Sequence, residues 1–326
     1  MTLRPNNRRH RLQIEAGTTG RNRGHKFEGI LAHEINCLDS ITINPQEHHS
    51  PHVTHGNPAM QLLQYISNNE QITINGFAAY WVGGLATSGQ GDTLIDTNGN
   101  PIKKCKSDVV IKITDSNNNI RTVGVSVKTC NKKTPTNDQL FFTTATAFCQ
   151  LLRNNDIAVS DYAEYGMRMF CGDTGYRPLD LMTPEELQNR ISDPNRYYWE
   201  EMTLQAQQDW KTIFTENQDK ITRLLLQKAY NDDPFPPDYL LHQTCFYENF
   251  NCCETAIFTI DEIISLSKEH QGYTLSEYKI KKGTHRNDNN THYAPRFGFV
   301  QFQRGGQKQH PSQLQFNLKA GYFRHI

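Results

Sequence analysis

An aspartate and a lysine at the two ends of a predicted β-hairpin are the residues best placed to do chemistry. Asp108 comes directly before the apolar run VVIKIT, and Lys128 ends the run TVGVSVK. The residues from Asp115 to Asn119 separate these runs and are typical of a turn, so the runs are predicted to pair as antiparallel strands. Cross-strand neighbours lie roughly 5 Å apart, so the side chains of Asp108 and Lys128 can share one small site.

A carboxylate and an amine that converge at the end of an apolar hairpin fit the hydrolysis of phosphodiesters. The carboxylate binds a hard divalent cation through oxygen. The cation stabilises the transition state and acidifies a bound water, while the ammonium orients or assists that water. Strand alternation places Ser126 on the same face as Lys128 and turns Val125 and Val127 to the other face.

The order and spacing of these residues resemble the PD-(D/E)xK nuclease superfamily and, within it, the type II restriction endonucleases. In that family an Asp opens one strand and a (D/E)-x-K triplet closes the next antiparallel strand. Ser107–Asp108 and Ser126–Lys128 stand in those places here. The stretch Arg23–Glu28 resembles the preceding helix of the family, which often carries a Glu after a glycine and a basic residue. The segment NDQLFFTTATAF resembles the helix that follows the catalytic strand, so the resemblance covers about residues 21–153.

The resemblance implies Mg²⁺-dependent hydrolysis that leaves 5′-phosphates. Asp108 would bind Mg²⁺, the backbone carbonyl of Val127 would assist, and Lys128 would activate the attacking water. Ser126 occupies the position where the family normally has a metal-binding Asp or Glu, so another carboxylate has to complete the site. Glu28, at the edge of the apolar stripe of its predicted helix, is the preferred candidate. Glu34, nearer the middle of that stripe, is the alternative.

A glutamine-rich C-terminal stretch is the candidate for reading DNA bases. It alternates aromatic and polar residues, and its candidate DNA-binding side chains are Gln301, Gln303, Arg304, Gln307, Lys308, Gln309 and Gln313. Arg pairs bidentately with guanine and Gln with adenine in the major groove, while Lys reaches guanine or phosphate. The Gly305–Gly306 turn lets the backbone approach the duplex closely. The alternative interpretation is a glutamine-rich hairpin on an ordinary surface.

Two loops raise further hypotheses. The glycine-rich loop Gly83–Asp92 lacks the GK[ST] sequence of a phosphate-binding P-loop, and it is either a flexible flap over DNA or merely a loop. Four histidines crowd the loop His48–His55, near Cys37. This grouping raises a zinc hypothesis, but structural zinc sites usually draw their ligands from two separated pairs, and the sequence offers no matching second pair.

Composition and charge limit the class of protein. Lys plus Arg equal Asp plus Glu at 34 each, which argues against indiscriminate coating of nucleic acid. Two basic stretches, Arg4–Lys26 and Lys279–Arg324, are either solvated surface or arms that face an anionic partner. No stretch reaches the roughly 18 apolar residues that span a membrane, and the first residues lack the apolar segment of a secretory signal. The eight cysteines form no CxxC pair, so reduced thiols in the cytoplasm are expected.

The sequence therefore predicts an α/β fold, a mixed β-sheet core flanked by helices, with a helical insertion. The expected division is a basic N-terminal arm (1–23), a catalytic core (24–155), a helical subdomain (156–240) and C-terminal strands (241–326) that complete the core and contact DNA. The expected function is site-specific cleavage of double-stranded DNA in the bacterial cytoplasm by a homodimer, because two copies related by a twofold axis match a palindrome. The alternatives are a structure- or damage-directed nuclease of the same superfamily and a DNA-binding module whose catalytic site has decayed.

Overall fold

A computed structural model gives the fold of the chain in two compact units, each of which is described here by itself. The structure describes residues 8–38, 41–47, 52–96, 98–130, 137–190, 193–228, 233–244, 253–270, 272–279, 291–304 and 313–319. Unit 1 comprises residues 1–138, 226–264 and 320–326, and unit 2 comprises residues 139–225 and 265–319.

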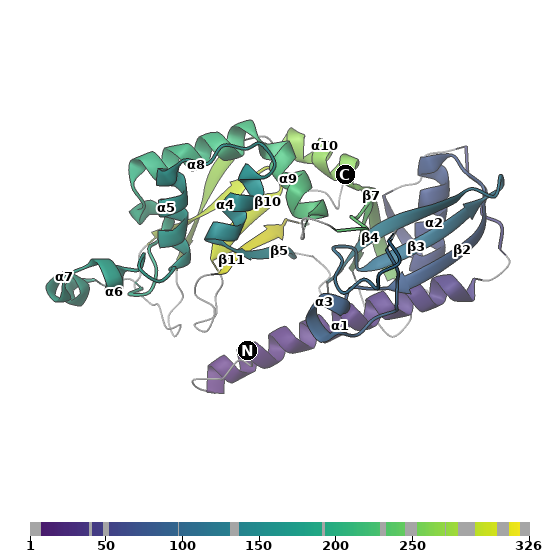
Figure 1. Ribbon diagram of the computed structural model, residues 1–326, viewed down its shortest axis with the longest axis horizontal. Coiled ribbons are helices and arrows are strands. Elements are labelled where there is room, and N and C mark those ends of the chain that lie inside the picture. Colours follow the sequence, from purple (N-terminus) through teal and green to yellow (C-terminus); the bar gives the residue numbers. More distant parts are fainter. Residues whose placement is uncertain are drawn as a thin grey trace. The chain divides into compact units, whose positions relative to one another are not determined.

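Unit 1 is built on a mixed β-sheet (Figure 1). Among the described residues its six strands hydrogen-bond in the order β1-β7-β6-β4-β3-β2. In that order they are Val53–Gly56, Cys253–Thr259, Tyr239–Thr244, Ile120–Cys130, Val109–Asp115 and Ile74–Trp81. The β4–β6 pair is parallel and the other pairs are antiparallel. The prediction of a mixed sheet flanked by helices is therefore confirmed.

The hairpin β3–β4 forms where the sequence predicts it. Val109 pairs with Val125, and the strands are joined by a turn after Asp115. The Asp115 carboxylate closes this turn, because its Oδ1 accepts hydrogen bonds of 2.8 Å from the backbone N–H groups of Asn117 and Asn119. Asn118 between them adopts the left-handed conformation, with φ of 63°, which asparagine tolerates better than most residues. The register of the whole hairpin is set by this turn chemistry.

Two helices, α1 (Arg8–Cys37) and α2 (Pro58–Glu70), cover one face of the sheet of unit 1. The buried side chains Leu31 and Ile35 of α1 pack in one apolar cluster with Val125 and Val127 of β4. Helix α1 begins at Arg8, so most of the segment predicted to be a basic arm is the first half of this helix. A short helix, α3 (Leu85–Ser88), lies in the glycine-rich segment that follows β2.

Unit 2 contains a second, separate sheet. In the part of it that the structure describes, five strands follow the order β5-β11-β10-β9-β8. They are Asp138–Thr144, Gln313–Leu318, Val300–Arg304, Thr291–Phe297 and Tyr273–Lys279. The described helical elements that lie wholly in unit 2 are α4 (Ala145–Arg153), α5 (Asp161–Cys171), α6 (Pro178–Leu181), α7 (Pro184–Asn189), η1 (Trp199–Glu201) and α8 (Leu204–Glu216). Two further helices, α9 (Gln218–Gln227) and α10 (Ile260–Glu269), have residues in both units.

The C-terminal strands (241–326), predicted to complete the core sheet, are divided between the two sheets: β7 and most of β6 lie in the sheet of unit 1, whereas β9, β10 and β11 do not. They pair with β5 and β8 instead, and their apolar face packs against the aromatic side chains of α4 and α8. Phe302 and Phe316 lie 5.1 Å and 4.7 Å, between ring centroids, from Phe214 and Phe148 respectively. Alternation along a strand predicts which face is buried but not which sheet receives it, so the aromatic residues of unit 2 decide the pairing.

The segment after Lys128 also differs from the prediction of one buried helix. Its first half is the strand β5, and its second half is α4. The run LFFTT is rich in aromatic and β-branched residues, which favour strands. Thr144 then caps α4, because its side chain accepts a hydrogen bond of 3.2 Å from the backbone N–H of Ala147. Among the described residues no helix is long and apolar enough to cross a membrane.

Candidate active site

Asp108 and Lys128 meet at the open end of the β3–β4 hairpin. The backbone N–H of Asp108 donates to the carbonyl of Val125 at 2.9 Å, which continues the ladder one residue before β3 and sets Asp108 opposite Ser126. Lys128 Nζ lies 3.1 Å from Asp108 Oδ2, and each side chain is 19% exposed. An acid and an amine therefore share a partly enclosed site that solvent can still enter.

The Asp108 carboxylate is fixed by β4. Its Oδ2 accepts a hydrogen bond of 2.7 Å from the backbone N–H of Val127 and one of 3.3 Å from the Ser126 hydroxyl. Lys128 Nζ donates to Ser126 Oγ at 2.9 Å and to the Val127 carbonyl at 3.0 Å. Ser126 thus links the acid and the amine by hydrogen bonds, in the position where the resembled family has a carboxylate.

Glu28 of α1 brings a second carboxylate to this site. It is only 6% exposed, and its Oε2 accepts a hydrogen bond of 3.0 Å from the indole N–H of Trp81, at the end of β2. A Cβ placed on Gly83 would lie 2.3 Å from Glu28 Oε2 and 3.2 Å from the Asp108 Cα. The glycine therefore leaves the space in which the Glu28 carboxylate lies beside the Asp108 backbone.

A nearby positive charge would stabilise the ionised carboxylates of Glu28 and Asp108. The pKa of Glu28 is raised to about 8, chiefly by burial and then by the charge of Asp108, while the hydrogen bond from Trp81 and the charge of Lys128 oppose the shift. The Glu28 and Asp108 carboxylates repel each other when both are ionised. A divalent cation held between them would remove this repulsion.

The donor atoms fit Mg²⁺, which prefers oxygen ligands and retains several waters. Carboxylate oxygens of Asp108 and Glu28 and the carbonyl of Val127 make up the donor set available at the hairpin end. Within the described residues no group of three His, Cys, Asp or Glu side chains gathers, so two carboxylates are what the protein offers here.

Several supporting residues have no counterpart in the motifs read from the sequence. The backbone N–H of Lys106 donates to Asp233 at 2.5 Å, and the Ser107 hydroxyl donates to the Phe235 carbonyl at 2.7 Å, which fixes the chain just before Asp108. Burial and the charge of Lys128 lower the pKa of Lys106 to about 7, so a second amine stands near the site. These partners lie more than a hundred positions apart in the chain, so no local sequence pattern predicts them.

A buried His–Asp contact lies next to Lys128 in the sheet. His242 of β6 is the register partner of Lys128 in the parallel β4–β6 pair. Its Nε2 lies 2.7 Å from Asp138 Oδ2, and both residues are buried. The contact lies within unit 1, to which both His242 and Asp138 belong.

The candidate DNA-reading side chains lie in unit 2, in the hairpin β10–β11. Gln303 is paired in register with Gln315, and its Nε2 donates to the Gln315 side chain at 3.4 Å. Gln301 and Gln313 belong to the same polar face, since they alternate with buried aromatic and aliphatic residues. The side chain of Arg304 and the residues Gln307, Lys308 and Gln309 lie outside the described residues.

The remaining candidates have local structural partners. His52 stacks on Phe258 with ring centroids 4.4 Å apart, and the Nε2 of His55 lies 3.6 Å from a Glu254 carboxylate oxygen. Cys37 contacts His33 one turn earlier in α1, at 3.5 Å. His48 and His49 lie outside the described residues. The described part of the histidine-rich loop thus shows contacts that need no metal.

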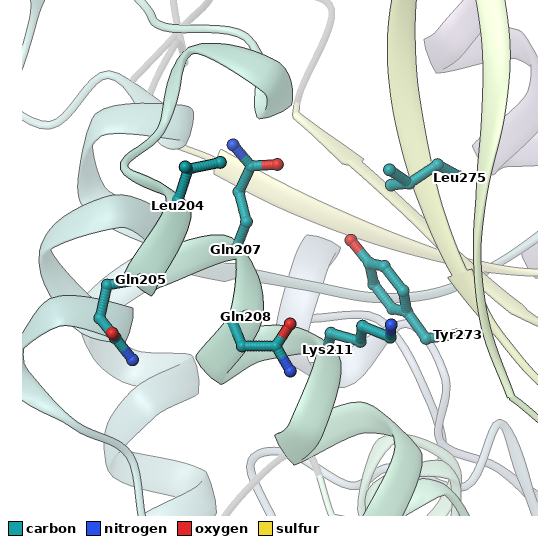
Figure 2. Close-up of a pocket in the computed structure, with 7 residues that line it drawn as sticks. All are labelled: Leu204, Gln205, Gln207, Gln208, Lys211, Tyr273 and Leu275. Atoms are coloured by element: carbon teal, nitrogen blue, oxygen red, sulfur yellow. The ribbon is translucent and has the colours of Figure 1, made fainter.

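A pocket of about 430 Å³ lies in unit 2 between α8 and β8 (Figure 2). Its lining residues are Leu204, Gln205, Gln207, Gln208, Lys211, Tyr273 and Leu275. None of these seven is acidic, and the amide groups of Gln205 and Gln207 donate to Asp209 and to the Met202 carbonyl, at 2.6 Å and 2.9 Å. The pocket therefore has no carboxylate in its lining with which to hold a cation.

No protein-family model matches the chain, and no curated protein sequence matches it either. Among solved structures the chain is similar to the restriction endonuclease MspI, in a crystal structure of that enzyme with its cognate DNA. The match has 14% sequence identity and a TM-score of 0.43, and it covers 79% of this chain and 76% of the MspI chain.

Replacing Gly83 by alanine tests whether Glu28 belongs to the site. The added Cβ would collide with the Glu28 carboxylate and push it away from Asp108. We expect Gly83→Ala to weaken divalent-cation binding or cleavage by roughly 10- to 100-fold, the usual effect of disturbing a residue that supports a metal site. Isothermal titration calorimetry with Mg²⁺ measures the affinity, and circular dichroism checks that the fold is kept. An unchanged affinity would exclude Glu28 as a ligand.

Proposed function

We propose that this protein is a Mg²⁺-dependent endonuclease that hydrolyses phosphodiester bonds of double-stranded DNA. The observation that supports it most is the convergence of Asp108, Lys128 and the buried Glu28 at the end of one hairpin. The family resemblance of the motifs points to the same chemistry. Asp108 and Glu28 would hold the cation, with the Val127 carbonyl as a further oxygen ligand.

The residues of the chain divide the work of hydrolysis between them. When bound, Mg²⁺ supplies Lewis-acid stabilisation of the negative charge that develops on the phosphoryl group, and it acidifies a water molecule. Lys128 orients the attacking water and adds positive charge beside it. The Ser126 hydroxyl and the Val127 N–H hold the Asp108 carboxylate in place, so its position does not change with the substrate. The products carry 5′-phosphates.

Sequence-specific cleavage, as in a type II restriction endonuclease, is the finer form of this proposal. The polar face of β10–β11 supports it, because Gln301, Gln303 and Gln313 present amide groups that pair with base edges. A homodimer in the bacterial cytoplasm would place two active sites on the two strands of a palindrome. Ser126 favours one competing function, a DNA-binding module that has lost cleavage, because it removes an acid from the motif.

A cleavage assay on plasmid and phage DNA tests the proposal. With Mg²⁺ we expect discrete bands, and with EDTA in place of Mg²⁺ we expect intact DNA. A smear instead of bands would point to a structure- or damage-directed nuclease of the same superfamily. Binding in a gel-shift assay without any cuts, in Mg²⁺ and in Mn²⁺, would identify a decayed DNA-binding module and contradict the proposal.

A further inference from the structure

A pocket of about 640 Å³ lies in unit 1 beside the candidate active site, between α1 and the segment that follows β2. Its lining residues are Asn22, His25, Lys26, Gly29, Ile30, His33, Trp81, Ser88 and Gln90. Six of them come from α1, at the spacing of one helical face. The other wall is formed by Trp81, Ser88 and Gln90, so the glycine-rich segment after β2 lines this pocket.

The pocket adjoins the carboxylates of the site through Trp81. The indole of Trp81 lines the pocket and donates its N–H to Glu28 at 3.0 Å. Gly29 lies close to this ring, since a Cβ there would lie 3.7 Å from two of the ring atoms, in ordinary van der Waals contact. His25 of α1 lies near the same ring, with 6.3 Å between the ring centroids of His25 and Trp81. A ligand in this pocket would thus lie against the same indole that donates to Glu28.

The charge and size of the pocket indicate which class of ligand it can bind. None of the nine lining residues is acidic, and Lys26 and two histidines supply positive charge or N–H donors. An aromatic face next to a cationic side chain is the combination that binds single-stranded nucleic acid, because bases stack on the ring and phosphates pair with the cation. The volume falls within the range of roughly 300–1,000 Å³ that is usual for sites of small organic ligands. One nucleotide fits that description.

We propose that this pocket binds one nucleotide of the substrate strand beside the scissile phosphate, with its base against Trp81 and its phosphate on Lys26. The proposal rests on the proposed nuclease function and adds a subsite to it. Because Trp81 also holds Glu28, occupancy of the pocket orients the second carboxylate as well as the strand.

Ligand binding in this pocket can be followed by tryptophan fluorescence, because Trp81 lines it. The sequence contains three tryptophans; Trp199 and Trp210 are fully buried in unit 2, whereas Trp81 is half-buried and lines the pocket. The full chain is titrated with thymidine 3′,5′-bisphosphate in Ca²⁺, and intrinsic fluorescence and its quenching by iodide are followed. We expect a saturable change in emission and protection of the exposed fraction from iodide. Trp81→Phe should remove both signals.

Two lysine variants test whether nucleotide affinity depends on Lys26 in particular or only on the overall positive charge of the protein. Lys26→Ala should weaken nucleotide binding by about tenfold and lower the salt slope of duplex binding by about one, as expected for one lost phosphate contact. Lys112→Ala is the matched control, since Lys112 is an exposed lysine of β3 that lies over the Tyr80 ring and does not line the pocket. It should leave nucleotide affinity unchanged.

The two proposals fail in different ways. If plasmid is cleaved but the nucleotide changes neither emission nor quenching, the pocket is not a nucleotide site, and the nuclease assignment is unaffected. Equal affinities of Lys26→Ala and the unmodified protein would likewise overturn the pocket assignment. A Lys26-dependent response in a protein that never cuts DNA would support the nucleotide site and overturn the nuclease.

Discussion

Lys128→Ala is expected to lower the rate of DNA cleavage by roughly 10²- to 10⁴-fold, the usual contribution of one proton-transfer or water-orienting group. The variant removes the only side-chain amine found within hydrogen-bond distance of Asp108 in the described residues. The carboxylates that hold the cation remain, so DNA binding in Ca²⁺ should change by less than about tenfold. Cleavage is measured in single-turnover experiments, which separate chemistry from product release.

Lys112→Ala is the matched control for this prediction. Lys112 belongs to the same hairpin, four residues beyond Asp108, and its ammonium lies 5.5 Å from the centroid of the Tyr80 ring. The control variant should cleave at the normal rate. Full cleavage by Lys128→Ala would remove Lys128 from the mechanism, and loss of DNA binding together with cleavage would point to a structural role instead.

The hairpin could be predicted from the sequence because its determinants are local. Asp115 and Asn119 make the turn with their own backbone and side-chain hydrogen bonds, and the flanking Val and Ile residues favour strands. The register then follows, and with it the meeting of Asp108 with Lys128. All of this information lies within about twenty residues.

The surroundings of Glu28 could not be predicted in the same way. Helical phase places Glu28 at the edge of a buried face, which makes it a candidate, but Trp81 and Gly83 lie more than fifty positions away in the chain. Their approach depends on how α1 packs on the sheet, and tertiary packing of this kind leaves no local pattern. The placement of β9, β10 and β11 in the second sheet could not be predicted for the same reason, because the aromatic residues against which these strands pack are distant in sequence.

Glu28→Gln is expected to separate activity from stability. The substitution keeps the size of the side chain and its ability to accept the hydrogen bond from Trp81, but it removes the negative charge. We expect cleavage to fall by roughly 10²- to 10³-fold, because one of two carboxylate ligands for the cation is lost. Glu34→Gln, on the same helix, is the matched control and should cleave normally. If Glu34→Gln abolishes cleavage instead, Glu34 supplies the second carboxylate.

The stability of the metal-free protein should change in the opposite direction. The pKa of Glu28 is raised from its ordinary 4.5 to about 8, chiefly by burial and then by Asp108. Between these values the folded state holds a proton that the unfolded chain has released, so the stability that Glu28 contributes is lost as the pH rises from about 4.5 to 8. Glu28→Gln cannot lose a proton, so without metal at pH 8 it should melt at a higher temperature than the unmodified protein.

Added Mg²⁺ should reverse this order, because only the protein with both carboxylates gains stability from the cation. Thermal melts at pH 5 and pH 8, with EDTA and with Mg²⁺, measure these differences. If the unmodified protein melts at the higher temperature in EDTA at pH 8, the two carboxylates do not repel each other, and the site is not built for a cation.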